Sequence, residues 1–355
     1  MRRRLGVAVC AAAVVAAAFA AATAAATGVQ LSPTRGTKWP DRGFLLSLPS
    51  GQRLQPSRIS VTENGAPVLG ATVVPASSAH ASFGTVLVID ASDSMRGRAI
   101  VGAVEAARAF AARRNVNQRL AVLTFNSSSH LALPFTRSDA KIRDALSGVP
   151  RLAHGTNLYD ATAQAIGQIQ AARVNGGAVV LLTDGADTGS TIGLTEVTKL
   201  AQDAHVRVFA VGLRSITFRP AALQQLASAT GGSFSEAGSA SALATIFDQL
   251  GLKLANEYVV TYRSLVDPAR QVRVNVSIAG LGTGRAAYES PPLSTPTFHR
   301  AVVDRIWQSW ITMLVLALLF AALIWLVLFV TLRPRSSTVR TRARFSSGRK
   351  PKRWP

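Results

Sequence analysis

The chain has 355 residues, enough for about two domains, and 48% of them are hydrophobic, which is enough for a buried core. Its formal net charge of +21 is unevenly distributed, because three arginines lie in the first four residues and nine basic residues, with no acid, follow Leu332. The rest of the chain carries only +9. This distribution argues against a nucleic-acid-binding protein and favours basic segments beside membranes.

Residues 1–26 have the features of a secretory signal peptide. Three arginines precede an uncharged run rich in Ala and Val, and three alanines end the segment before Thr27, at the expected cleavage point. An uncleaved anchor is the alternative, although alanine is a weak membrane residue. Cys10, the single cysteine, lies inside this segment, so the mature chain would have neither a thiol nor a disulfide framework.

Two short segments rich in strand patterns flank the middle of the chain. Residues 27–82 contain apolar alternations at 44–48 and 58–62 and no helical pattern, and residues 254–290 contain clear alternations at 257–262 and 272–278. Because two or three isolated strands are only marginally stable, we expect the flanks to combine into one small β-sandwich.

Between the flanks, residues 83–253 alternate strands and helices, which predicts a doubly wound α/β fold with a mostly parallel six-stranded sheet. Pro134 favours an edge position for its strand. On the helix at 98–114, a stripe of Val101, Val104, Arg108 and Ala111 is expected to face the sheet. The strands are expected at 86–89, 120–125, 131–135, 178–183, 206–213 and 231–234, and the other helices at 139–146, 158–173, 195–205, 221–230 and 242–255.

The last part of the chain has the pattern of a membrane anchor. A linker rich in Pro, Ser and Thr at 291–306 leads to residues 307–332, which contain no charge. At ~1.5 Å per residue this segment is long enough to cross a bilayer core of ~30 Å. A buried core helix is the alternative. The basic tail at 333–355 predicts a single-pass protein of the cell membrane with a cytoplasmic tail and an extracytoplasmic central domain.

Polar side chains follow two buried strands and one loop of the central region. Asp90 ends the first apolar run, and Ser92 and Ser94 follow at alternating positions, so an extended loop can aim a carboxylate and two hydroxyls at one point. Thr156 ends a polar loop before a helix, and Asp184 follows another apolar strand. Open α/β sheets bind ligands at the carboxyl ends of their strands. Oxygen donors without His or Cys favour Mg²⁺, or Mn²⁺ or Ca²⁺, over Zn²⁺.

The order Asp90-x-Ser92-x-Ser94, then Thr156, then Asp184 resembles the metal-ion-dependent adhesion site of the von Willebrand factor A domain. The resemblance covers residues 83–253. It implies that the two serines and the threonine bind the ion directly, while the two aspartates bind it directly or through water. A coordination place then stays open for an Asp or Glu carboxylate of a protein partner.

Residues beside this motif have less specific patterns. Asp160 is either an acceptor behind the ligands or a first-turn helix residue, and Asp187 is expected to be a solvated loop residue that shapes specificity. The histidines His130, His154 and His205 have no metal-ligand spacing and are expected at the surface or at helix ends.

The sequence therefore predicts an exported, membrane-anchored protein that binds a protein partner through a divalent metal ion, in adhesion or in assembly of an envelope, secretion or pilus complex. An enzyme is not expected, because the chain lacks a nucleophile elbow, a P-loop and the second aspartate of aspartyl phosphatases. Two alternatives stay open: a structural subunit of a membrane complex whose metal only stabilises the fold, and a metal-dependent envelope hydrolase.

Overall fold

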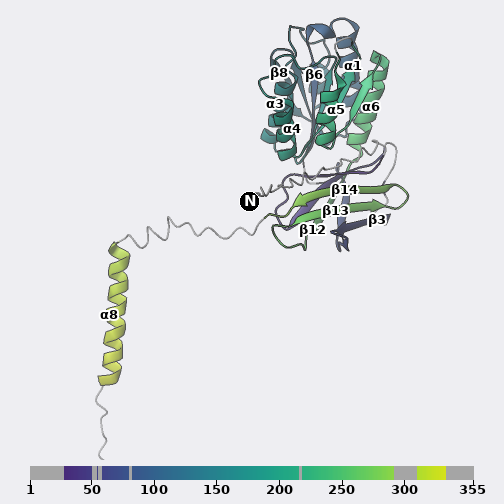
Figure 1. The fold of residues 1–355 in the computed structure, drawn as a ribbon. Helices are drawn as coiled ribbons and strands as arrows, with labels where there is room; N and C mark the ends of the chain where they lie inside the picture. Colours follow the sequence, from purple (N-terminus) through teal and green to yellow (C-terminus); the bar gives the residue numbers. More distant parts are fainter. Residues whose placement is uncertain are drawn as a thin grey trace, which may run out of the picture. The chain divides into compact units, whose positions relative to one another are not determined.

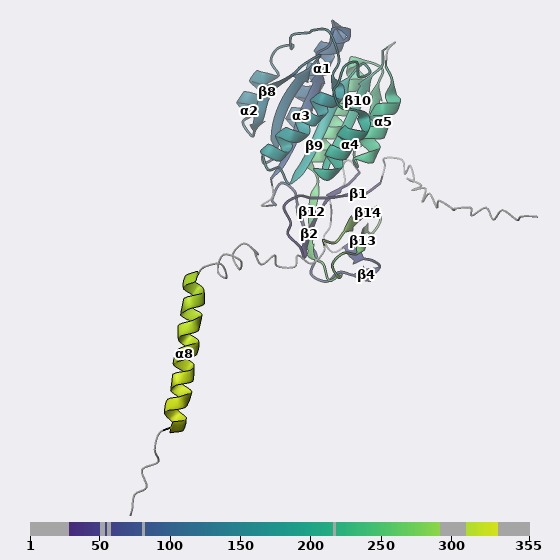
Figure 2. The same cartoon turned by 60° about the vertical axis from the view of Figure 1, so that its left-hand side comes forward.

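The computed structural model describes residues 28–49, 54, 58–79, 82–215, 218–291 and 310–332. It divides into two units, Met1–Pro292 and Leu293–Pro355, which are drawn in Figure 1 and Figure 2. The expected signal peptide at 1–26, the basic tail at 333–355 and nearly all of the expected linker lie outside the described residues.

A six-stranded sheet forms the middle of the first unit, in the order β11-β10-β9-β6-β7-β8. Every residue of the central strand β6 is buried, and all neighbouring pairs are parallel except the edge pair of β7 and β8. The expected mostly parallel sheet and the edge position of the Pro134 strand are confirmed. The strands are β6 (Phe83–Asp90), β7 (Arg119–Phe125), β8 (Ser129–Thr136), β9 (Gly176–Thr183), β10 (Val206–Leu213) and β11 (Phe234–Ala237).

Helices cover both faces of this sheet (Figure 1). One apolar cluster joins the sheet to α3, α4 and α5, which lie side by side in Figure 2, and a second joins its other face to α1, α2 and α6. This is the two-sided burial of a doubly wound fold. The helices are α1 (Arg98–Arg113), α2 (Asp139–Ala145), α3 (Leu158–Ala171), α4 (Leu194–Asp203), α5 (Pro220–Ala229) and α6 (Ala240–Ala255).

The stripe expected on α1 is wrong. Val101 is 46% exposed and Arg108 is exposed, and of the four expected residues only Val104 is buried. The helix packs against α6 as well as the sheet, so its buried face is broader than one stripe and includes Ala103 and Phe110. The last strand also begins at Phe234, three residues later than expected.

The flanking segments form two four-stranded sheets, in the orders β1-β2-β12-β5 and β14-β13-β3-β4. As expected, strands from the two flanks pair with each other: β12 with β2, and β13 with β3. Both sheets contribute to one apolar cluster, which includes Phe44, Val260 and Val274. The strands are β1 (Gln30–Pro33), β2 (Asp41–Ser47), β3 (Ile59–Glu63), β4 (Ala66–Pro67), β5 (Thr72–Pro75), β12 (Tyr258–Arg263), β13 (Gln271–Ile278) and β14 (Gly282–Glu289).

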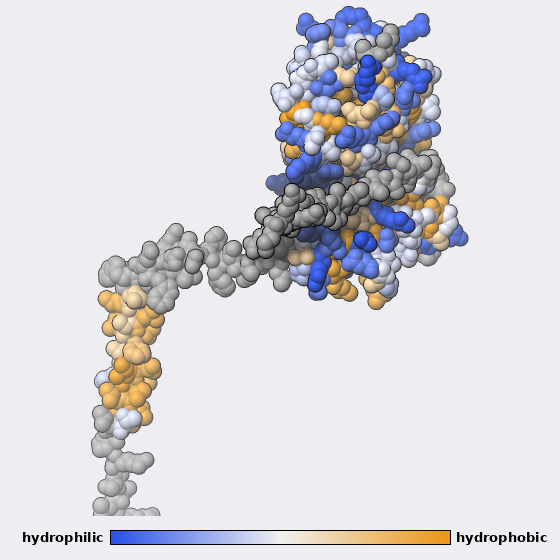
Figure 3. Space-filling model, viewed as in Figure 1, coloured by the Kyte–Doolittle hydropathy of each residue, from blue (hydrophilic) through white to orange (hydrophobic). Residues whose placement is uncertain are grey.

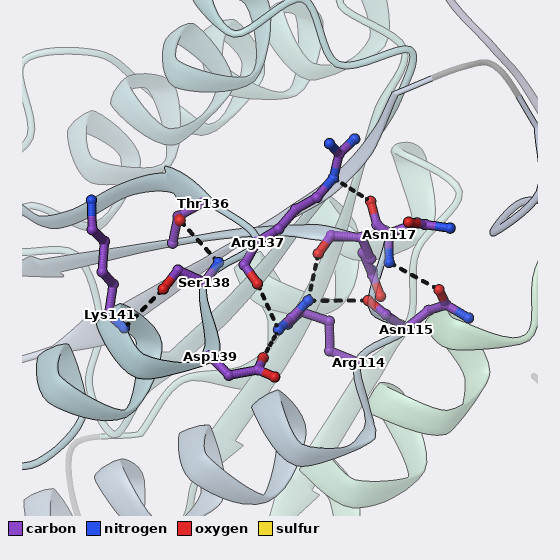
Figure 4. Close-up of polar contacts among 9 residues, drawn as sticks. Arg114, Asn115, Asn117, Thr136, Arg137, Ser138, Asp139 and Lys141 are labelled. Atoms are coloured by element: carbon purple, nitrogen blue, oxygen red, sulfur yellow. Dashed lines mark hydrogen bonds and ion pairs between the residues drawn. The ribbon is translucent and has the colours of Figure 1, made fainter.

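Polar contacts secure the end of the central sheet that lies near the flanks. The side chain of Arg114, which is 3% exposed, donates to the carbonyls of Asn115 (3.1 Å) and Gln118 (2.9 Å) and pairs with Asp139 (Figure 4). The side-chain amide of Asn117 donates to the backbone carbonyl of Ser77 at 2.7 Å. These bonds join the end of α1 to the start of α2 and to the N-terminal flank.

The second unit contains α8 (Trp310–Leu332). Within it, Met313–Thr331 has a mean hydropathy of 3.1 and none of it is buried, so by length and composition it can cross a membrane. In Figure 3 the surface of α8 is mostly hydrophobic, whereas the folded part of the first unit has a largely hydrophilic surface.

Candidate metal centre

Asp90 lies fully buried at the carboxyl end of β6, where the parallel register of Ile89 with Leu182 brings the ends of β6 and β9 together. The carboxylate accepts two hydrogen bonds. The backbone N–H of Ser92 donates to Oδ1 at 2.8 Å, and the hydroxyl of Thr183 donates to Oδ2 at 2.6 Å. Thr183 is a neighbour of the candidate site that the sequence did not reveal, because it belongs to an apolar strand with no motif of its own.

A chain of hydroxyls connects this first loop to the end of β9. The Oγ atoms of Ser92 and Ser94 lie 2.9 Å apart, and Ser94 donates to Oδ1 of Asp184 at 2.7 Å. Asp184 is 3% exposed, and its carbonyl accepts from Ser215 at 2.6 Å. The structure therefore brings together four of the five residues expected at the site, Asp90, Ser92, Ser94 and Asp184.

Thr156, the fifth residue, lies on an adjacent loop and is 5% exposed. That loop is held beside the first one, because Ala153 forms a parallel bridge with Ser92. Gly155 has a φ of +88°, and a Cβ there would lie 2.9 Å from Ser127, so the turn before Thr156 favours glycine. Among the described residues, no hydrogen bond joins the Thr156 hydroxyl to the other four side chains.

The residues beside the motif have structural contacts. The expectation that Asp187 is a solvated loop residue is wrong. Asp187 is partly buried, and its Oδ1 accepts from the backbone N–H of Leu158 at 2.8 Å. Asp160 lies in the first turn of α3, and its carboxylate accepts from the backbone N–H of Thr191 at 2.9 Å. The histidines expected at the surface, His130, His154 and His205, are exposed.

Residues 85–249 match the model of the von Willebrand factor type A domain. This part of the chain is similar to a von Willebrand factor type A domain and is called the A domain here. No curated protein matches the chain.

Solved structures resemble the chain only distantly. A von Willebrand factor type A protein from Catenulispora acidiphila is 16% identical, with 75% of each chain covered and a TM-score of 0.47. The domain of the type V pili tip protein Mfa5 from Porphyromonas gingivalis is 12% identical, covering 49% of this chain and 95% of that one, with a TM-score of 0.42. The conserved hypothetical protein BatB from Bacteroides thetaiotaomicron is 18% identical, covering 49% and 99%, with a TM-score of 0.41.

The two acids of the candidate site, Asp90 and Asp184, are buried without a basic side chain paired to them among the described residues. Burial raises the pKa of Asp90 to about 6, although its hydrogen bonds oppose the shift, and burial also raises the pKa of Asp184. Neither carboxylate forms an ion pair with any Lys, Arg or His that the structure describes. Ionised carboxylates in such a place need a cation.

The donor chemistry of the A domain fits a hard divalent ion. The side chains that converge at the candidate site offer only carboxylate and hydroxyl oxygens, which suit Mg²⁺, Mn²⁺ or Ca²⁺. Within the described residues, no group of three or more His, Cys, Asp or Glu side chains is placed to hold a metal. A thiolate or imidazole zinc site therefore has no support among these residues.

Proposed function

We propose that the A domain binds a divalent cation, Mg²⁺ or alternatively Mn²⁺ or Ca²⁺, and uses it to bind a carboxylate of a protein partner. Asp90, Ser92, Ser94, Thr156 and Asp184 would hold the ion. The observation that carries this proposal is the pair of buried acids, which are connected through Ser92 and Ser94 and form no ion pair with any described Lys, Arg or His. Burying two carboxylates without a cation is costly, so a bound divalent ion would stabilise their ionised forms.

The hydroxyls of this chain suit an ion that must still accept another ligand. Ser94 donates its proton to Asp184 and accepts from Ser92, which leaves one lone pair of its oxygen for a cation. Two carboxylates can at most neutralise a divalent charge, and the serine and threonine oxygens add none. A bound ion would therefore supply an electrophilic position for an Asp or Glu oxygen of the partner.

The proposed role is binding and not catalysis. Among the described residues, neither Ser92 nor Ser94 is hydrogen-bonded to a histidine or lysine that could take its proton. An activated serine nucleophile needs such a base. The hydroxyls and acids of the site are therefore proposed as ligands only.

We further propose that the protein is exported and anchored in the cell membrane by α8, with the A domain outside and the tail in the cytoplasm. The apolar length of α8 and the basic residues after it support this orientation. Its partners would then be proteins of the envelope, including membrane proteins of a secretion or pilus system. A net positive outer region favours the approach of an acidic partner surface.

The test uses the full-length chain in detergent. Calorimetric titration with Mg²⁺ should show binding that Asp184→Ala abolishes, while Asp203→Ala, which removes an exposed acid on α4, should bind normally. Absence of binding to the unmutated chain would refute the metal site. Envelope proteins cross-linked to the chain should be lost in EDTA and recovered with Mg²⁺. Partners retained equally in EDTA would instead support a structural subunit.

A further inference from the structure

The helix that follows Thr156 has an unusual N-terminus. A helix leaves its first N–H groups without partners, and the residue before the helix normally accepts from them. Asn157, at that position in α3, makes no such bond with its side chain. Residues of the loop after Asp184 accept from these N–H groups in place of Asn157. Asp187 Oδ1 accepts from Leu158 N–H at 2.8 Å, and Ser190 Oγ accepts from Tyr159 N–H at 3.0 Å.

The same two segments are also bonded in the opposite direction. Asp160, in the first turn of α3, accepts from the N–H groups of Thr191 (2.9 Å) and Ile192 (3.2 Å). The hydroxyl of Thr191 donates to the same carboxylate at 3.0 Å. Residues 156–160 and 187–192 thus form a reciprocal set of hydrogen bonds, called here the loop clasp.

Thr156 lies at one end of the loop clasp. Its N–H donates to the hydroxyl of Thr188 at 2.9 Å, and its carbonyl accepts from the N–H of Thr188 at 2.9 Å. Both backbone polar groups of Thr156 are therefore held by the loop that begins at Asp184. The positions of two expected metal ligands on different loops are coupled by these bonds.

We propose that Asp187 and Ser190 are positioning residues of the metal site. Neither residue is one of the proposed ligands. By capping α3 from the neighbouring loop, they hold the Thr156 backbone in place before the ion arrives, so that little ordering is needed on binding. The inference rests on the proposed function, since it assumes an ion at Thr156 and Asp184. Removing a residue that holds a metal ligand in place typically weakens metal binding by about 10–100-fold.

The experiment compares Mg²⁺ affinities of full-length variants in detergent by calorimetry. Asp187→Ala should weaken binding by about tenfold or more. Asp187→Asn keeps an oxygen that can accept from Leu158, so it should recover most of the affinity despite the lost charge. Asp203→Ala is the control for charge alone, because Asp203 is exposed and pairs with Lys199.

A second readout needs no metal. In EDTA, hydrogen exchange at the amides of Leu158 and Tyr159 should accelerate in Asp187→Ala and stay slow in Asp187→Asn. Should Asp187→Ala fail to fold, Ser190→Ala provides the test, because it removes the bonds to Tyr159 and Asp160, together with the bond that its hydroxyl donates to Asp187, and keeps the Asp187 carboxylate.

The outcomes separate the two proposals. If the unmutated chain does not bind Mg²⁺, the proposed function fails, whatever the variants do. If it binds Mg²⁺ and Asp187→Ala binds equally well, the positioning role is overturned while the metal site stands. Equal losses in Asp187→Asn and Asp187→Ala would also overturn it, because they would assign the effect to charge.

Discussion

At the scale of single residues, Asp90 is a buried acid in the candidate metal site, and its burial is expected to lower the stability of the metal-free chain. Its pKa in the folded chain is about 6, above the ordinary value of 3.8, because the carboxylate is buried. At pH values between 3.8 and about 6, Asp90 is protonated in the folded chain and ionised in the unfolded chain. The stability contributed by this protonation is complete below about pH 4 and is lost as the pH rises through about 6.

Asp90→Asn should therefore stabilise the metal-free chain at pH 7.5, by up to about 3 kcal/mol, since one pKa unit corresponds to about 1.4 kcal/mol. The advantage should shrink as the pH falls through about 6 and vanish below the ordinary value of 3.8, where Asp90 is protonated in both states. Thermal unfolding in EDTA at several pH values measures it, with Asp203→Asn as the control. An advantage that does not change with pH would contradict this account. Added Mg²⁺ should stabilise only the unmutated chain and the control.

Thr183 offers a second test at this scale. Its hydroxyl donates to Asp90 Oδ2 and accepts from the N–H of Gly185 at 3.1 Å. Thr183→Val keeps the shape but removes both bonds, so Asp90 loses the donor that orients it. We expect Mg²⁺ affinity to fall by about tenfold, as measured by calorimetry. An unchanged affinity, with the variant folded, would show that Ser92 alone orients Asp90.

At the scale of elements, the sequence predicted most of what depends on local pattern. The strand before Asp90 and the helix that Ser138 caps were both visible, because periodicity and capping are local. What failed depends on distant neighbours. Asp187 caps a helix that begins 29 residues earlier, and no local pattern encodes such a bond. The strand β14 was not predicted either, since Gly282–Glu289 contains two glycines and little apolar alternation.

The contact of α1 with α6 gives an element-scale prediction. A Cβ on Gly102 would lie 2.7 Å from the Cβ of Ala240, too close for an unshifted helix pair. Gly102→Ala should therefore destabilise the chain by about 1–2 kcal/mol, although alanine favours helices. Gly167→Ala is the matched control, because nothing lies within 4 Å of its added Cβ on α3. It should stabilise by up to about 1 kcal/mol. Equal thermal shifts for the two variants would contradict the close packing.

At the scale of the whole molecule, the A domain is joined to its flanking sheets by a buried ion pair. Arg207 of β10 is 4% exposed and Glu257, next to β12, is 4% exposed. The Nη2 atom of Arg207 lies 3.0 Å from Oε2 of Glu257, its Nη1 atom contacts Oε1, and Ser47 of β2 donates to the same carboxylate. The sequence could not reveal this pair, because an arginine within an apolar strand normally indicates an exposed position.

Breaking this pair should therefore unfold more than one part of the first unit. Arg207→Met leaves the Glu257 carboxylate buried without its cation and should cost about 3–5 kcal/mol. Glu257→Leu should cost a similar amount, because it leaves the guanidinium unpaired. The double variant removes both charges and should recover much of the loss, since replacing a whole buried pair with apolar side chains is often neutral.

Thermal unfolding of the full-length chain in EDTA, followed both by tryptophan fluorescence and by hydrogen exchange in β2 and β10, measures these effects. If the A domain and the flanking sheets form one cooperative unit, exchange in both strands should accelerate together in Arg207→Met. Acceleration in β2 alone would show that the flanking sheets unfold independently and that the pair only attaches them to the A domain.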